Sequence, residues 1–267
     1  MFARSRQKMG HHRLGRLPKT QRWREVVDVL SASPGDVQAI SRAVLRAAEE
    51  RLRALAHDES LTYSFWLLTR ITWAARQDDF AGVLSELGLD VAEDTSSLVF
   101  ISSVADRLRG RFAKHTQSGP FTELASIALR RALSETIGQR GPSLFDSSVE
   151  DLRLALRTYS TPVQFGAIAH LFFGDFLART LTYFLDREVA NAVGALPSKS
   201  ALETNRELLA GIDLYARQSA RIARDFAGGW YAKHNWESKG EISQDEASRF
   251  VGYALKKLRM ELQRESD

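Results

Sequence analysis

One segment, from Pro162 to about Val193, constrains the fold of this chain more than any other. Thr161-Pro162 is typical of a helix start, and Gly194 and Pro197 end the pattern. The side chains between them are apolar on almost every side of the expected helix, including Phe165, Ile168, Phe172, Phe173, Phe176, Leu177, Leu181 and Phe184. Because a helix that is apolar nearly all round is a buried one, we predict a central buried helix over about 162–193.

The polar side chains of this segment gather in one narrow stripe. At 100° per residue, five of them fall within an arc of about 60°: Gln164, Asp175, Arg179, Thr182 and Asp186. The stripe is either a solvated seam with an Asp175–Arg179 ion pair or a buried polar cleft that binds a ligand or partner. His170 lies on the opposite, apolar side, where we expect a neutral imidazole hydrogen-bonded to a backbone carbonyl.

The rest of the chain also has helical periodicity. Apolar residues recur at spacings of three and four, and convincing strand patterns are missing. Capping-box patterns precede three helices, at Ser147-x-x-Glu150, Ser200-x-x-Glu203 and Ser243-x-x-Glu246. We expect the second of these helices to run to Ala227. The sequence therefore predicts an all-α, multi-helix bundle of about ten helices, with a helical domain over 20–267. A lobe boundary near 138–147 and one continuous bundle are both compatible with the pattern.

The composition fits a globular protein and excludes several classes. Hydrophobic residues make up 44% of the 267 residues, which is enough for a large core. The chain has no cysteine, so it has no disulfide, thiol nucleophile or cysteine-ligated metal. No run of about 18 apolar residues lacks charges, and the N-terminus lacks the apolar stretch of a secretory signal. We therefore expect a cytoplasmic protein with no membrane contact.

Basic residues are concentrated at the N-terminus. Lys and Arg number 37 against 33 Asp and Glu, but the first 24 residues contain eight basic residues and no acidic one. We interpret 1–19, which includes Arg13 and Arg16, as a flexible basic arm that orders on an acidic partner, with Arg22 close behind it. A tail without a role and a mitochondrial transit peptide are the alternatives.

A second group of basic residues lies on the helix that we expect to begin at Ser200. Arg217, Arg221 and Arg224 share one face of that helix. Such a face is a phosphate-binding surface if it adjoins other basic faces in space, and a solvated helix face if it does not.

The segment 228–237 is the most unusual in the chain. Gly228-Gly229 predicts the end of a helix, and an irregular loop with polar-tipped aromatic side chains follows. Its candidate binding residues are Trp230, Tyr231, His234, Asn235 and Trp236. Aromatic side chains on a loop suit stacking on a base, a peptide or a ligand ring. The alternative is that the two tryptophans pack the loop onto the bundle.

No catalytic motif accompanies these features. The phosphate-binding Gly-x-x-x-x-Gly-Lys loop, the His-Glu-x-x-His metal motif and the Gly-x-Ser-x-Gly nucleophile motif are all absent. We therefore assign no catalytic residue, no metal ligand and no cofactor.

These observations favour a non-enzymatic binding or assembly subunit. Its partner would be acidic, either nucleic acid or a protein, and a homo-oligomer is compatible with the sequence. A helical protein of this type could belong to a bacterial multi-protein system such as phage defence, although no residue of the sequence indicates this. The alternative is a helical hydrolase or nuclease with a site near His170 and Asp175, or at His234.

Overall fold

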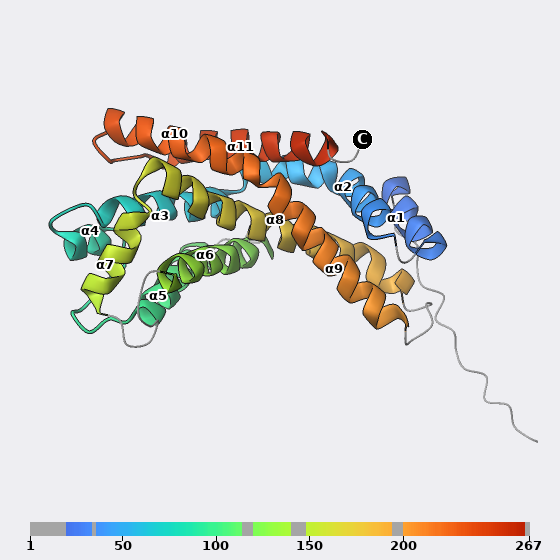
Figure 1. The fold of residues 1–267 in the computed structure, drawn as a ribbon, viewed down its shortest axis with the longest axis horizontal. Helices are drawn as coiled ribbons and strands as arrows, with labels where there is room; N and C mark the ends of the chain where they lie inside the picture. The colour runs from blue at the N-terminus through green and yellow to red at the C-terminus, as the bar shows by residue number, and fades with distance from the viewer. Residues whose placement is uncertain (1–19, 34–35, 114–119, 140–147, 194–199, 265–267) are drawn as a thin grey trace, which may run out of the picture.

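The computed structural model describes residues 20–33, 36–113, 120–139, 148–193 and 200–264, and every regular element in these ranges is helical. The predicted all-α, multi-helix bundle is confirmed (Figure 1). The α-helices are α1 (Gln21–Ala32), α2 (Val37–Ala54), α3 (Glu59–Ala74), α4 (Phe80–Glu86), α5 (Ser97–Phe112), α6 (Pro120–Gly138), α7 (Val149–Thr158), α8 (Pro162–Val193), α9 (Ser200–Ser219), α10 (Arg221–Glu237) and α11 (Gln244–Arg264). A short 3-10 helix, Leu55–His57, joins α2 to α3.

Side-chain caps explain where several helices begin. Asp58 accepts a hydrogen bond from the Leu61 N–H at 2.8 Å and starts α3. At α11 the predicted capping box forms: the Glu246 N–H donates to the Ser243 hydroxyl oxygen, and the Ser243 N–H and hydroxyl both donate to the Glu246 carboxylate. These bonds hold the pKa of the Glu246 carboxyl below its ordinary value. At α7 the box is Ser148 with Asp151, one residue later than predicted.

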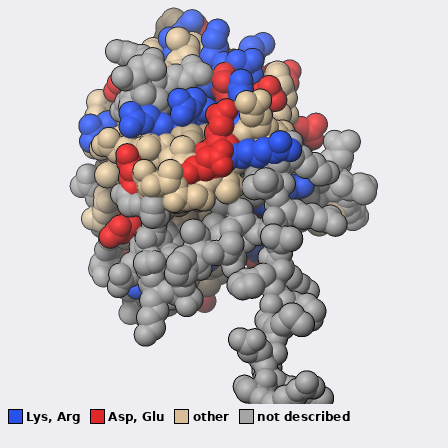
Figure 2. Space-filling model, turned by 90° about the vertical axis from the view of Figure 1, so that its right-hand side faces the viewer, with Lys and Arg blue, Asp and Glu red and all other residues tan. Residues whose placement is uncertain are grey.

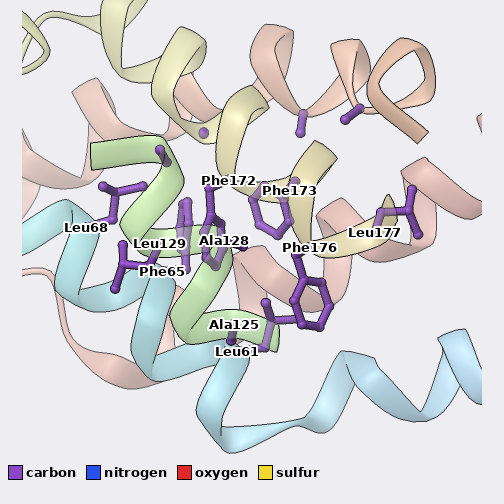
Figure 3. Packing of buried hydrophobic residues seen from close by; sticks show 14 of the residues in the cluster. Leu61, Phe65, Leu68, Ala125, Ala128, Leu129, Phe172, Phe173, Phe176 and Leu177 are labelled. Atoms are coloured by element: carbon purple, nitrogen blue, oxygen red, sulfur yellow. The ribbon is translucent and has the colours of Figure 1, made fainter. Parts of the chain in front are cut away.

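The helices pack in layers, and α8 lies between two of them. In Figure 1, α10 and α11 lie above α8, while α5 and α6 lie below it. Contacts of α8 are most extensive with α10, followed by α9 and α6. Figure 3 shows the core where α3, α6 and α8 meet: Phe65, Leu129 and Phe172 point toward one another. The three side chains are fully buried, so the apolar pattern of these helices leads directly to their packing.

The prediction of a helix buried along its whole length is not confirmed. Side chains such as Phe165 and Leu185 are buried, but Val163 near the start of α8 is 69% exposed, and Asp186 and Arg187 are exposed. The side chains that follow Arg187 on this helix lie outside the description. The apolar pattern therefore indicates burial of the middle of α8, and its described ends contact solvent.

Two boundaries predicted between 200 and 237 are wrong. The expected single helix to Ala227 is divided after Ser219, so that α9 and α10 are separate helices. The expected loop over 228–237 is helical instead, and it forms the second half of α10. Figure 1 shows α9 and α10 running in different directions.

Close packing between α8 and α10 explains one glycine on each helix. A Cβ at Gly228 would overlap the Pro162 carbonyl oxygen, and a Cβ at Gly166 on α8 would overlap the Arg224 carbonyl oxygen. The missing side chains therefore let the two helix backbones approach each other. Gly228 serves this contact in a helical conformation, whereas we predicted that it ends the helix.

The predicted basic arm, 1–19, lies outside the described residues, as does most of the predicted lobe boundary. Buried residues from α1 to α11 belong to one hydrophobic cluster. The arm and the boundary stay predictions from sequence.

Candidate functional site

The predicted basic residues have different environments. Arg13 and Arg16 lie outside the described residues. Arg22 donates to the Arg46 carbonyl at 3.2 Å and lies 3.5 Å from the Glu49 carboxylate. Figure 2 views the end of the molecule that carries α1 and α2, where Lys and Arg side chains are interrupted by Asp and Glu. This face is therefore not a surface of a single sign.

The predicted Arg face from Arg217 to Arg224 is divided between two helices. Arg217 belongs to α9, and its side chain turns inward to Asp175 and Asp213. Arg221 and Arg224 begin α10 and are exposed, and they form no ion pair within the described part of the chain. Only Arg221 and Arg224 of this predicted face are therefore free to contact a partner.

A buried carboxylate, Asp175, holds three helices together. It lies on α8 with 1% of its surface exposed. Arg131 on α6 donates to its Oδ1 at 2.9 Å, Arg179 on α8 donates to its Oδ2 at 2.5 Å, and Arg217 on α9 donates to its Oδ1 at 3.3 Å. The arrangement is neither a solvated seam nor an open cleft. The polar stripe of α8 supplies Asp175 and Arg179, and two other helices supply Arg131 and Arg217.

Charge in this cluster is balanced. Arg131 also pairs with Glu135 at 2.7 Å, and Arg217 pairs with Asp213 at 2.7 Å. The three arginines therefore have three acidic partners, counting Asp175. Both oxygens of Asp175 accept hydrogen bonds from arginines, and the residue is buried, so the carboxylate is held in contacts between helices. We name this group of six side chains the Asp175 cluster. Its ion pairs join α6, α8 and α9.

The two histidines of the alternative enzymatic interpretation make separate structural contacts. His170 Nε2 lies 2.8 Å from the Arg217 carbonyl oxygen, as expected for a histidine hydrogen-bonded to the backbone. His234 Nδ1 lies 2.9 Å from the Trp230 carbonyl oxygen, one turn earlier on α10. Trp230 packs in turn against Phe65 and Phe250. Trp230 therefore packs onto the bundle, as the alternative for the two tryptophans proposed, whereas Trp236 is 84% exposed and does not.

The other three residues predicted in 228–237 line a surface pocket of about 780 Å³. Tyr231, Asn235 and Trp236 contribute one wall from α10. The last turn of α3 and the turn before α8 contribute the others. The lining residues are Trp73, Arg76, Gln77, Ser160, Pro162, Tyr231, Ala232, Asn235, Trp236 and Lys239. We name this the α10 pocket.

Tyr231 forms the rigid base of the α10 pocket. Its ring stacks on Phe165 with the centroids 3.9 Å apart, and its hydroxyl accepts a hydrogen bond from Thr72 at 3.2 Å. Burial raises the pKa of Tyr231 above its ordinary value of 10.0, although Thr72, Asn235 and Arg76 act in the opposite direction. Tyr231 is therefore a neutral, fixed ring at neutral pH.

Asn235 is the least satisfied polar side chain of the pocket. Its amide is close enough to the Tyr231 hydroxyl to influence the pKa of that group. Neither Nδ2 nor Oδ1 of Asn235, however, makes a hydrogen bond of good geometry within the described residues, and both atoms are buried. A buried amide without partners costs roughly 1–3 kcal/mol. A ligand that supplies a donor and an acceptor to this amide would remove that cost.

A tight turn after α10 places Lys239 at the pocket. Lys239 and Gly240 both have positive φ, 53° and 91°. The Gly240 N–H donates to the Asn235 carbonyl at 2.9 Å, and its own carbonyl accepts from Arg70 at 2.7 Å. A Cβ at Gly240 would overlap the indole of Trp73. The turn therefore tolerates only glycine there, and it fixes Trp73 and Lys239 relative to each other.

Sequence reasoning missed Trp73, Arg76 and Lys239. Trp73 lies in the last turn of α3 and Arg76 lies just after the helix ends, but nothing in the local sequence connects them with α10. Arg76 and Lys239 are exposed and form no ion pair with any carboxylate that the structure describes. The α10 pocket thus combines unpaired cations, exposed aromatic surface and an unsatisfied amide.

Among the described residues, no three His, Asp or Glu side chains converge as metal ligands would. No helix in the same ranges has the length and apolarity needed to cross a bilayer. Comparisons with protein families, characterised proteins and solved structures found no match to this chain.

Proposed function

We propose that this chain is a non-enzymatic binding subunit whose acidic partner is single-stranded nucleic acid, contacted through the α10 pocket. The observation that carries the proposal is Trp236, whose surface is 84% exposed at a pocket that also presents Arg76 and Lys239. Exposed aromatic rings beside cations are the elements that bind single strands, because every base has a face for stacking and every nucleotide carries a phosphate.

The energies support this choice of partner. Base–aromatic stacking contributes about 1–3 kcal/mol per base. Neutralised phosphates release counterions and make binding dependent on salt. An acidic protein segment would pair with Arg76 and Lys239 but would leave the ring of Trp236 without a matching surface unless it also carried aromatic residues.

The basic arm belongs to the same proposal. Residues 1–19 contain six of the basic side chains, and they would add sequence-independent phosphate contacts beyond the pocket. Arg221 and Arg224 would add further contacts from the start of α10. Their contribution would appear in the salt dependence of binding, since these residues offer no ring for stacking.

The test is a fluorescence anisotropy titration with a labelled 20-nucleotide single strand at salt concentrations between about 50 and 200 mM. Trp236→Ala should weaken binding about tenfold or more, through the loss of stacking. Phe226→Ala is the matched control, because Phe226 is an exposed aromatic residue on the same helix outside the pocket. Deletion of 1–19 should flatten the salt dependence and leave the effect of Trp236→Ala in place.

Two outcomes would contradict the proposal. One is a wild-type chain that does not bind the strand at the lowest salt concentration. The other is equal binding by Trp236→Ala and Phe226→Ala. A labelled acidic peptide is titrated in parallel. If the peptide binds, if Trp236→Ala abolishes that binding, and if the strand does not bind, the partner is a protein.

A further inference from the structure

We infer that the α10 pocket holds one unpaired base, adenine by its hydrogen-bond pattern, with the attached phosphate against Arg76 or Lys239. The inference rests on the proposed function and names the ligand that the pocket selects.

Size and shape support a ligand of one nucleotide. The pocket volume of about 780 Å³ lies within the range of about 300–1,000 Å³ that is typical of small-molecule sites. Trp73 is fixed, because the Arg70 guanidinium lies 4.8 Å from its ring centroid and the Gly240 turn packs on it. Trp236 is not held in this way and can close on a base that enters. The pocket therefore offers a rigid wall and one adjustable ring.

Asn235 supplies the chemical basis for selection. Its amide atoms are buried at the pocket wall, so contact with a ligand requires a rotation of the side chain. That rotation gives up only the contact with the Tyr231 hydroxyl, because neither atom makes a hydrogen bond of good geometry within the described residues. An amide presents one acceptor and one donor group, which match N6–H and N7 of adenine. Guanine presents two acceptors at the same edge, O6 and N7, and one of them would face the amide oxygen.

The charges of the pocket agree with a nucleotide rather than a neutral ring. Arg76 and Lys239 reach it from two different elements, and neither is neutralised by a carboxylate within the described ranges. Glu237, which is not among the lining residues, lies 3.8 Å from Lys233 and pairs with it locally on α10. A phosphate attached to a bound base would therefore meet uncompensated positive charge.

The test uses free nucleotides as probes of the full-length chain, with tryptophan fluorescence and calorimetry as readouts. AMP should bind about tenfold or more tightly than ribose 5-phosphate, which has the same phosphate and sugar but no base to stack. AMP should also bind about tenfold more tightly than GMP. Asn235→Leu should remove the preference for AMP over GMP and keep the preference over ribose 5-phosphate. Gln218→Leu, at an exposed position on α9, is the matched control.

Folding of the variant is checked in the same experiment. Asn235→Leu removes a buried amide that has no hydrogen-bond partner, so its thermal unfolding midpoint should equal or exceed that of the wild type. A lowered midpoint would contradict the assignment of Asn235 as an unsatisfied group. The inference is overturned if AMP and ribose 5-phosphate bind equally, or if Asn235→Leu keeps the preference for AMP.

The outcomes separate this inference from the proposed function. A strand that binds in a Trp236-dependent way, with no preference among free nucleotides, would remove the adenine site and keep nucleic-acid binding. AMP that binds selectively while no strand binds would keep the base site and show that a free nucleotide is the ligand.

Discussion

The Asp175 cluster and the α10 pocket both contain cationic side chains and differ in how those side chains are paired. In the cluster, each of three arginines contacts an acidic side chain, and the buried carboxylate joins three helices. In the pocket, two cations lack carboxylate partners within the described residues, an amide is unsatisfied, and Trp236 is exposed. The comparison teaches that charge pairing, rather than the presence of charge, separates a structural contact from a candidate binding site.

The two regions also lie at different positions along α8. The cluster is centred on Asp175, near the middle of the helix, whereas the pocket includes Pro162 at its first turn. The close α8–α10 contact at Gly166 and Gly228 positions the pocket wall. Changes at the cluster should therefore affect stability, and changes at the pocket should affect binding.

The largest expected effect is on the cluster. Asp175→Ala leaves three arginines without their shared buried partner and should lower the free energy of unfolding by about 3 kcal/mol. The measurement is urea denaturation followed by circular dichroism. The control is Asp106→Ala, which removes an exposed pair with Arg109 and should cost less than about 1 kcal/mol. Equal losses of unfolding free energy in both variants would mean that the cluster does not hold the three helices together.

An intermediate effect is expected where the turn supports the pocket. Gly240→Ala places a side chain at a φ of 91° and against the Trp73 indole, and it should cost about 2 kcal/mol of stability. Gly229→Ala is the matched control. Its Cβ would meet no atom within 4 Å inside a helix, so it should gain roughly 0.5–1 kcal/mol. Urea denaturation of both variants should show opposite signs, and a shared sign would contradict this description of the turn.

The smallest effect concerns the buried phenol of the pocket. Tyr231→Phe loses the hydrogen bond from Thr72 and should cost about 1 kcal/mol at neutral pH. Because burial raises the pKa of Tyr231 above 10.0, the unfolded chain loses this proton before the folded chain does. Wild-type stability should therefore fall as the pH rises above about 10, by up to 1.4 kcal/mol per pH unit from this group.

The variant has no phenol at this position and should lack that part of the slope. The difference between wild type and Tyr231→Phe should then shrink as the solution becomes more alkaline. Urea denaturation from pH 7 to 11 measures it, with Tyr253→Phe at an exposed position as the control. A constant difference across this range would show that Tyr231 does not contribute to the alkaline slope.

Local patterns were sufficient for the helices but not for all of their ends. Ser243 caps α11 at the position that the sequence indicated, because a cap is formed by residues only a few positions apart. Gly228 misled the prediction because its purpose is contact with the Pro162 carbonyl, a residue far away in the sequence. Glycine as a helix end and glycine as a packing contact look identical in one sequence.

The candidate site was predicted in part for the same reason. Tyr231, Asn235 and Trp236 were identified by their chemical types within one short segment. The sequence did not separate them from Trp230 and His234, which pack inward, since that division depends on which side of α10 contacts the core. Arg217 was assigned to a partner surface, although a buried acid on another helix holds it.

The sequence by itself determined that this protein is helical, that its apolar segments form a core, and that unusual aromatic and basic residues stand between 217 and 237. These properties follow from spacing and from side-chain chemistry, which act over one or two turns of a helix. The tertiary structure decided which charges are neutralised and which rings stay exposed. Pairing and exposure depend on groups from different helices, and only the packing of α3, α8 and α10 brings Trp73, Arg76 and Asn235 to one pocket.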